Sequence, residues 1–547
     1  MKIFGTVQPF VESADSSFRI GRLVANYEFY NALFRHSDFD EFHIFCPTFN
    51  NCRLTSEKIA QENFTQVQKN RIKIFHISSL KQTIAENSYH IFHLGGWGFF
   101  YPGLAHFRNC HSPKMFPITG VTHSLNAKES AFHALKVCMA PTMPFDSIVC
   151  TSNCGKKVLQ NLFAQAQENF KLSGAKYHGR MDVIPLGIDD AYRKIPDRAE
   201  SRKLLGIDND SFVILVLGRL ETNNKMDILP FLQCVKNFIQ KNNGKKINLI
   251  IAGAADNQAQ KFIKDALKEN QLETAAKMFN NFEDSLKTHL YSAASVYASP
   301  IDNLQETFGI SVVEAMAHRC TPVISDFDGY SEIVDQNVNG IKIPTYWADA
   351  ADDFRDVSEI MNFPTHQLLL SQSIAVDFEK MSEAFQYLLD NRAKCDEFGK
   401  EARKKAEQKY FWSDIIKQYC NLWDELAKQA QENKAEIKKS KNPWEVDYWS
   451  VFSHYPSKII SADTKISLTE FGKEILISGK IPVPYSDISA SVIIPQLVSA
   501  GIKNIDQKTI TAGQFSKALK NNAEISDSTA MYYLLWMTKY NLIKIVE

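Results

Sequence analysis

The chain has 547 residues, of which 44% are hydrophobic and 23% charged, a composition typical of folded globular proteins. Its 62 lysines and arginines balance its 62 aspartates and glutamates, so charge favours neither nucleic acid nor an anionic membrane as the main partner. The length predicts three or four domains.

The N-terminal sequence MKIFGTVQPFVES has no long apolar core. We expect a first strand and loop there, not a signal peptide. No stretch approaches 18 uninterrupted apolar residues, so no membrane span is expected. The ten cysteines are scattered without a CxxC pair, which favours reduced thiols and a cytoplasmic location.

Short apolar runs alternate with longer amphipathic stretches in the first third of the chain. The predicted strands are 2–7, 42–47, 72–77, 89–96, 116–123, 147–152 and 182–187, and the clearest helices between them are 19–36 and 154–170. Alternation of strands and helices predicts a mainly parallel sheet with helices on both faces.

A second series of the same kind begins near residue 211. The predicted strands are 211–220, 247–254, 295–302 and 321–326, and the predicted helices are 228–242, 259–270 and 310–319. Two α/β domains therefore follow one another, with the seam near 184–196. Because open α/β sheets bind ligands beyond the carboxyl ends of their strands, two such domains facing each other would form a binding cleft.

The remaining segments differ from this pattern. Residues 346–372 are interpreted as an insertion on the second domain, and 380–428 is helical by pattern. The predicted domain organisation is 1–188 and 189–405 for the two α/β domains, 406–430 for a helix returning to the first, 431–445 for a linker and 446–547 for an accessory module. The order helix, turn, helix, strand predicts that this module is mainly helical and resembles a winged helix.

The segment SPIDNLQETFGISVVEAMAHR is the strongest chemical signal. Thr307 is expected to cap the helix that follows, which would leave the amides of Phe308, Gly309 and Ile310 available to an anion. The carboxylates of Glu306 and Glu314 would lie on either side of that anion. Two glutamates at this spacing are also compatible with an ordinary solvated loop and helix surface.

A second signal is LVLGRLETNNKMDIL. Arg219 follows an apolar strand and Lys225 precedes a helix, so both would project from the carboxyl end of the sheet. A guanidinium fork and an ammonium suit a diphosphate. Two solvated loop cations remain the alternative for this pair taken alone.

These motifs occur together in an order that resembles a known family. GRL…K, the strand IIAGA and E–TFG–I–E are similar to those of the retaining GT-B glycosyltransferases related to glycogen and sucrose synthases. VIPLGID at 183–189 resembles the seam between their domains, ITGVTH a first-domain strand ending in a histidine, and IVCTSNCGKKVL their strand-to-helix passage. The resemblance spans residues 1–430 and implies two Rossmann-like domains, an acceptor domain followed by a nucleotide-sugar domain.

The resemblance also implies a reaction, the transfer of a sugar from a nucleotide-diphosphate sugar with retention of anomeric configuration. It implies no metal and no cofactor, and no side chain is an evident covalent nucleophile. The implied roles are diphosphate binding by Arg219, Lys225 and the amides of Phe308, Gly309 and Ile310; contact with the sugar hydroxyls by Glu306; ribose binding by Glu314; and approach to the donor sugar by His123. A core histidine is the alternative for His123.

The chain departs from the family pattern after its first strand. The family often has a Gly-Gly pair in a loop that meets acceptor and phosphate, whereas this loop is VQPFVESADSSFRIG. Ser16, Ser17 and Gly21 are the candidates for that role.

Three other interpretations are open. Asp326-Phe327-Asp328 is a DxD triplet of the kind that holds a divalent metal in GT-A transferases. The 446–547 module could bind DNA, although its lack of a basic cluster argues against nucleic acid and favours self-association or protein contact. The whole chain could also be a non-catalytic GT-B-like binding protein. The acceptor, whether glycan, lipid, protein or small molecule, is not identified by the sequence.

Overall fold

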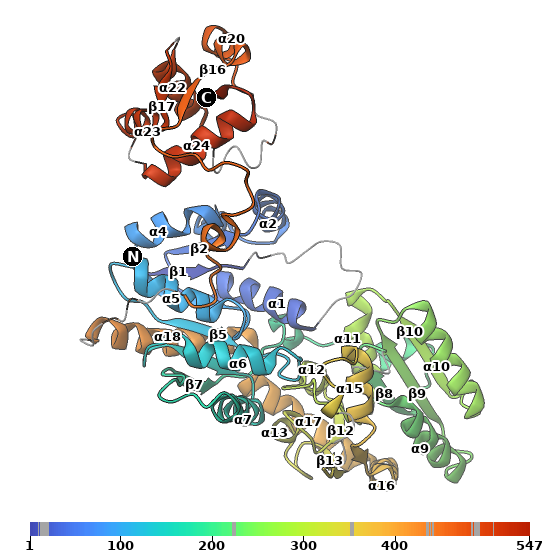
Figure 1. Cartoon of the computed structure of the whole chain (residues 1–547). Helices are drawn as coiled ribbons and strands as arrows, with labels where there is room; N and C mark the ends of the chain where they lie inside the picture. The colour runs from blue at the N-terminus through green and yellow to red at the C-terminus, as the bar shows by residue number, and fades with distance from the viewer. Residues whose placement is uncertain are drawn as a thin grey trace. The chain divides into compact units, whose positions relative to one another are not determined.

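The computed structural model describes residues 1–8, 10, 21–220, 226–349, 355–433, 437, 439, 442–482, 485, 493–506, 508–523 and 525–546 (Figure 1). The chain divides into two units. The first comprises 1–47, 54–75 and 81–440, and the second comprises 441–547 with the short segments 48–53 and 76–80. Each unit is described by itself.

The first domain of the larger unit is built on a seven-stranded sheet in the order β3-β2-β1-β4-β5-β6-β7, with every pair parallel. The strands are β1 (Ile3–Thr6), β2 (Glu41–Cys46), β3 (Ile72–His76), β4 (Tyr89–Leu94), β5 (Ile118–Val121), β6 (Ser147–Cys150) and β7 (Arg180–Val183). All seven overlap predicted strands; apolar runs mark the buried strands of the sheet centre, whereas the edge strands β3 and β7 are only partly buried or exposed.

Helices connect these parallel strands. They are α1 (Gly21–His36), α2 (Phe49–Gln61), α3 (Gln66–Asn70), α4 (Leu80–Glu86), α5 (Tyr101–His111), α6 (Ser130–Met139) and α7 (Asn153–Asn169). Helix α7 begins where Ser152 accepts a hydrogen bond from the Gly155 N–H at 2.9 Å, an N-cap that satisfies one of the unpaired amides of its first turn.

The second domain has a six-stranded parallel sheet in the order β10-β9-β8-β11-β12-β13. Its strands are β8 (Phe212–Leu217), β9 (Ile247–Gly253), β10 (Ala276–Asn280), β11 (Val296–Ser299), β12 (Thr321–Ser325) and β13 (Ile341–Ile343). Every residue of β8 is buried, as its uninterrupted FVILVL sequence requires. Strands β10 and β13 were not predicted.

The helices of the second domain follow its strands in turn. They are α8 (Arg198–Leu204), α9 (Ile228–Lys241), α10 (Asn257–Glu269), α11 (Asp284–Ala293), α12 (Ile310–Ala317), α13 (Tyr330–Ile333), α16 (Phe378–Asp390) and α17 (Arg392–Lys409). At the two ends of the predicted insertion 346–372, β14 (Thr345–Tyr346) pairs antiparallel with β15 (Ala375–Val376), and α15 (Phe363–Ser371) lies between them in sequence.

Helix α18 (Trp412–Glu432) packs on the first domain. Trp423 is fully buried, its ring lies 5.5 Å from that of Phe4, and its Nε1–H donates to Thr119 Oγ1 at 3.2 Å. At the seam, the Ile188 N–H donates to the Tyr410 carbonyl at 2.8 Å. Burial of an indole among aromatic rings fixes the chain where it returns to the first domain.

The second unit contains the short helix α19 (Tyr448–Phe452) and a three-stranded antiparallel sheet in the order β17-β16-β18. The strands are β16 (Lys465–Leu468), β17 (Ile510–Thr511) and β18 (Ile543–Val546), and the helices are α20 (Glu470–Ser478), α22 (Pro495–Ile505), α23 (Ala512–Lys520) and α24 (Asp527–Lys539). The predicted order of helix, turn, helix and strand corresponds to α23, α24 and β18. The predicted helical C-terminal region is therefore confirmed.

The predicted fold of two parallel α/β sheets is confirmed as well. In each sheet the strands are added first toward one edge and then toward the other. The switch point lies between β1 and β4 in the first sheet and between β8 and β11 in the second. Ligands bind doubly wound sheets at such points, beyond the carboxyl ends of the strands. Among the described residues, none of the helices is long and apolar enough to cross a membrane.

Candidate functional site

The switch point of the second sheet brings together the residues of both chemical motifs. Arg219 lies two residues past the end of β8 and is half-buried, and Glu306, also half-buried, lies in the connection from β11 to α12. Lys225, the second predicted cation, falls outside the described residues. Since β8 and β11 are hydrogen-bonded neighbours, Arg219 and the Glu306 loop leave the same edge of the sheet.

Helix α12 begins at this edge with a glycine. Gly309 is the N-cap, with φ +116°, and a Cβ there would lie 2.4 Å from the Tyr330 ring. Only glycine therefore fits this close approach of backbone to ring. Within the described part of the chain, the amides of Phe308, Gly309 and Ile310 donate to no protein group. They form the helix N-terminus that the sequence predicted as an anion site.

The prediction that Thr307 caps α12 is wrong, because no side chain caps this helix. Thr307 Oγ1 instead donates to the carbonyl of His123 in the first domain at 2.6 Å. Ser152 Oγ donates to the Thr307 carbonyl at 2.7 Å, and Thr151 Oγ1 lies 3.2 Å from Thr307 Oγ1. The hydroxyl is thus used to join the two domains directly beside the predicted anion site.

A carboxylate makes a second contact between the domains. Glu332, on α13, accepts hydrogen bonds from the backbone N–H groups of Asn153 at 3.0 Å and Cys154 at 2.7 Å. These are the first amides of α7, a helix N-terminus that favours negative charge. The predicted TSN passage therefore serves as a docking point for the second domain.

His123 follows β5 and lies near the switch point of the first sheet. Its Nε2 is 3.0 Å from Asn26 Oδ1, and Asn26 Nδ2 donates to the Gly95 carbonyl at 3.2 Å. The amide is oriented by Gly95, so its oxygen accepts from His123 Nε2–H. Burial, and to a smaller extent Arg22, lower the pKa of His123 to about 3. The imidazole is therefore neutral near pH 7 and acts through hydrogen bonds.

The weakest predicted site residues are those of the loop after β1. Ser16 and Ser17 fall outside the described residues, and Gly21 is the first residue of α1. At the same switch point Gln8, which follows β1, accepts a hydrogen bond from the Gly95 N–H at the end of β4.

Glu314 lies farther along α12 and is only 4% exposed. Its Oε1 accepts from Lys287 Nζ at 2.5 Å, and its Oε2 accepts from the Tyr291 hydroxyl at 2.9 Å. The Tyr192 hydroxyl lies 3.4 Å from Oε1. Burial lowers the pKa of Lys287, but the charge and hydrogen bond of Glu314 outweigh it, so the net pKa is raised. The predicted ribose carboxylate is thus an ion-paired group behind Lys287.

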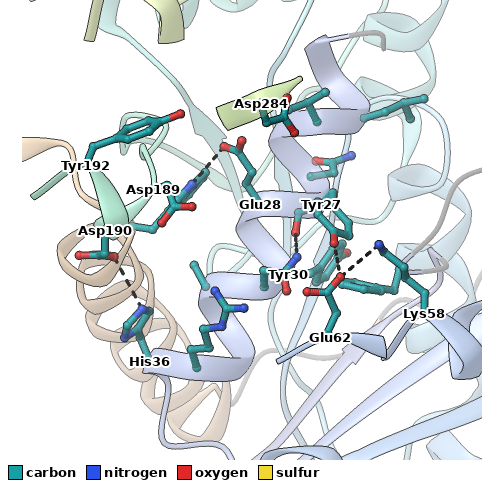
Figure 2. A pocket seen from close by; sticks show the side chains of 18 of the residues that line it. Tyr27, Glu28, Tyr30, His36, Lys58, Glu62, Asp189, Asp190, Tyr192 and Asp284 are labelled. Carbon is teal, nitrogen blue, oxygen red and sulfur yellow. Dashed lines mark hydrogen bonds and ion pairs between the residues drawn. The ribbon is translucent and has the colours of Figure 1, made fainter. Parts of the chain in front are cut away.

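A pocket of about 660 Å³ lies beside this ion pair (Figure 2). Lys287 and Asp284 of α11, residues of α1, Trp412 of α18 and the seam residues Asp189, Asp190 and Tyr192 line it. Figure 2 shows Glu28 projecting from α1 toward the side formed by Asp189, Tyr192 and Asp284, with the Lys58–Glu62 ion pair at the opposite side.

Glu28 is the most perturbed carboxyl group in this pocket. Burial, followed by the negative charge of Glu314, raises its pKa to about 7, although Trp412 Nε1–H donates to it at 3.3 Å. Two carboxyl groups close to one ammonium cannot both ionise without cost. Glu28 is therefore able to hold a proton near neutral pH, as a buried group in a ligand pocket often does.

The triplet considered as a metal site makes other contacts. Asp326 Oδ1 forms an ion pair with Lys342 Nζ at 3.1 Å, and Asp328 Oδ1 accepts from the Tyr330 N–H at 3.1 Å. Across the residues that the structure describes, there is no group of three or more histidine, cysteine, aspartate or glutamate side chains arranged to hold a metal ion.

Several of these residues were missed in the sequence. Asn26 and Glu28 lie on α1, and Lys287 and Tyr291 lie on α11, where helical spacing marks only an amphipathic face. One signal was available: Lys287 and Tyr291 are four residues apart, so both face the same side of α11. Their partner on α12 could not be read from that spacing.

The chain was compared with known proteins. Residues 197–366 match the model of the family described as Glycosyl transferases group 1. An uncharacterised glycosyltransferase of Methanocaldococcus jannaschii is 27% identical over 235 residues, 42% of this chain and 48% of the relative. A D-inositol 3-phosphate glycosyltransferase of Nocardia farcinica is 25% identical over 202 residues, 36% of this chain and 44% of the relative. The chain thus spans about half the length of the curated relatives it matches.

Solved structures share the fold. Sucrose-phosphate synthase from Thermosynechococcus elongatus covers 78% of this chain and 100% of its own length, with 15% identity and a TM-score of 0.51. Anabaena HepE, solved in complex with UDP, covers 77% of this chain and 99% of its own length, with 16% identity and a TM-score of 0.51. The predicted resemblance is therefore confirmed in two respects: residues 197–366 match the group 1 glycosyltransferase family model, and the chain has the GT-B fold.

Proposed function

We propose that this protein is a glycosyltransferase that moves a sugar from a nucleotide-diphosphate sugar to an acceptor, with retention of anomeric configuration and without a metal ion. One observation supports this most directly. The unpaired amides of residues 308–310 and Arg219 follow the neighbouring strands β11 and β8 at the switch point, and Thr307 donates a hydrogen bond to the carbonyl of His123. This contact supports the proposal that the candidate phosphate-binding amides and the candidate histidine belong to one site.

The charges of the site suit the reaction. When the bond between sugar and phosphate breaks, negative charge develops on the nucleotide diphosphate. A guanidinium and a helix N-terminus already in place stabilise that charge more in the transition state than in the ground state. Arg219 and the 308–310 amides are the described groups for this role, and Lys225 is proposed to add a second cation.

His123 contributes in a different way. Because its pKa is about 3, the ring carries no charge near neutral pH. With Nε2–H donated to Asn26, its orientation is fixed against α1. We propose that it contacts the donor sugar through hydrogen bonding and shape, while Glu306 accepts hydrogen bonds from the sugar hydroxyls.

The nucleoside end of the donor is proposed to lie toward the pocket of Figure 2. Lys287 lines that pocket and is ion-paired with Glu314, the residue implied to bind ribose. HepE binds UDP, which makes UDP the first nucleotide to test. A cytoplasmic location is proposed from the scattered cysteines, none of which is in a disulfide among the described residues.

The test is to incubate the purified protein with a panel of UDP-, GDP- and ADP-sugars, with and without excess EDTA, and to follow release of nucleoside diphosphate. We expect slow hydrolysis of one donor, unchanged by EDTA, and product of the donor's anomeric configuration by NMR. Loss of activity in EDTA that Mg²⁺ or Mn²⁺ restores would refute metal independence and return attention to Asp326. Tight UDP binding without turnover of any donor would favour the non-catalytic alternative.

A further inference from the structure

Residues 355–373, here called the strap, are attached to the second domain at their C-terminal end. The strap includes α15, which is followed directly by the β14–β15 pairing. Trp347 Nε1–H donates to Ser373 Oγ at 2.9 Å, and Gln372 Nε2–H donates to Asp227 Oδ2 at 2.9 Å. These contacts all lie within the second domain and hold the base of the strap.

The middle of the strap contacts the first domain. Lys128 Nζ donates to the Met361 carbonyl at 2.5 Å, and Asn126 Nδ2 donates to Gln367 Oε1 at 2.5 Å. Gln367 is 4% exposed, so this amide pair is shielded from water. A shielded hydrogen bond is costly to leave unmade, because the group that loses its partner remains desolvated.

The segment that receives the strap carries the candidate histidine. Residues 122–128 follow β5 and have no regular secondary structure until a turn at 127–129. The second domain therefore holds this loop at two places. Thr307 Oγ1 donates to the His123 carbonyl at one end, and the strap contacts Asn126 and Lys128 at the other.

The base of the strap is connected to the carboxyl end of β11 through Asp227. Asp227, which accepts from Gln372, is the N-cap of α9, the helix that follows residues 221–225 in the chain. The Asp227 N–H donates to Asp302 Oδ2 at 3.1 Å, at the carboxyl end of β11. Hydrogen bonds thus run from the end of β11 through Asp227 and the strap to the loop of His123.

We propose that the strap positions residues 122–128, and with them His123, against the donor domain, with Asn126 and Gln367 as positioning residues. The catalytic part of this inference rests on the proposed function. Neither side chain needs to touch the substrate, since the backbone of the loop transmits their effect. Because reaction rates respond steeply to small misplacements of a group near the reacting centre, the expected consequence is for turnover.

The first experiment measures docking and needs no activity. Hydrogen exchange of the full chain is followed in peptides covering 363–373 and 122–128, for the parent, Asn126→Ala, Gln367→Ala and the double variant. Gln233→Ala, which removes an exposed amide contact on α9, is the matched control. Each single variant should speed exchange in both peptides by roughly 3- to 10-fold, as expected for one lost hydrogen bond, with little added in the double. Unchanged exchange in the loop of Gln367→Ala overturns the proposal.

The second experiment uses the donor that the parent hydrolyses. Gln367→Ala and Asn126→Ala should lower kcat by roughly 10- to 100-fold and leave the donor KM within about twofold, because the donor's own contacts remain. Gln233→Ala should leave both unchanged. If hydrogen exchange shows that the strap undocks in a variant while its kcat is unchanged, the positioning role is overturned. If the parent hydrolyses no donor, the proposed function fails, and the exchange data still decide whether the strap holds the loop.

Discussion

Glu314→Gln is the substitution for which the structure changes the expected result most. The carboxylate is nearly buried and accepts from Lys287 at 2.5 Å and from Tyr291 at 2.9 Å. Removing one partner of a fully buried ion pair costs about 3–5 kcal/mol. Since the Lys287 side chain is 26% exposed and can turn partly to water, we expect a loss of about 2–3 kcal/mol in the free energy of unfolding.

A double-mutant cycle separates this stability effect from binding. Lys287→Met keeps the length of the side chain and removes the charge, so the pair of substitutions removes both ions together. The double variant should be more stable than the sum of the single losses predicts, by about 1–2 kcal/mol. Urea unfolding of the four proteins measures this coupling. Losses that simply add would show that the ion pair is not energetically coupled.

The same variants test where the donor binds. Under assay conditions in which the variant is fully folded, Glu314→Gln should raise the donor KM and leave turnover within about twofold. The ribose does not react, so its contacts are nearly the same in the ground state and the transition state. Glu306→Gln should do the opposite and mainly lower turnover, because contacts to the sugar strengthen as charge rearranges. Unchanged donor affinity in Glu314→Gln would show that Glu314 is not part of the donor site. Unchanged turnover in Glu306→Gln would show the same for Glu306.

Three further outcomes follow from the site and the domain organisation. Arg219→Ala should weaken UDP binding by about 1.5–3 kcal/mol, a change that titration calorimetry resolves; equal affinity would place Arg219 outside the site. Glu28 has a pKa of about 7 in the folded protein, against 4.5 in the unfolded chain, so between these pH values the folded state binds one more proton than the unfolded state. The free energy of unfolding should therefore fall by up to about 3 kcal/mol as the pH rises from 4.5 to 7. Glu28→Gln should abolish that slope in urea midpoints, and a slope equal to the parent's would contradict the assignment. A chain shortened to residues 1–435 should still hydrolyse donor, and an insoluble or inert product would make the second unit part of the catalytic fold.

The sequence was sufficient to predict the central strands of both sheets. Strands such as β8 are buried on both faces, and a run of branched apolar residues marks them without reference to any neighbour. Strand β10, with the sequence AKMFN, lacks such a run of branched apolar residues, and all five of its residues are only partly buried. The accessory unit was harder still, since β17 is two residues long and its strand character comes from pairing with β16.

The site was predictable where backbone geometry creates it. The start of a helix near Gly309 follows from local sequence, whereas the contact with Tyr330 that only a glycine allows is seen in the structure. Thr307 shows the limit of the same reasoning. Threonine is a preferred N-cap by local rules, yet α12 begins three residues after Thr307, and the Thr307 hydroxyl donates to the carbonyl of His123, 184 positions away in the chain.

The contacts that sequence reasoning could not find are those in which one group changes the chemistry of another across the fold. The pKa of Glu28 is raised to about 7 because the fold buries its carboxyl group and, to a smaller extent, brings it close to the negative charge of Glu314. Asn126 becomes a positioning candidate only because Gln367 reaches it from a segment that looks, in sequence, like an insertion. Local motifs therefore fix where phosphate and sugar are proposed to bind. How these groups are positioned depends on pairings between distant segments, and double-mutant cycles across such pairs, as for Glu314 with Lys287, measure that coupling directly.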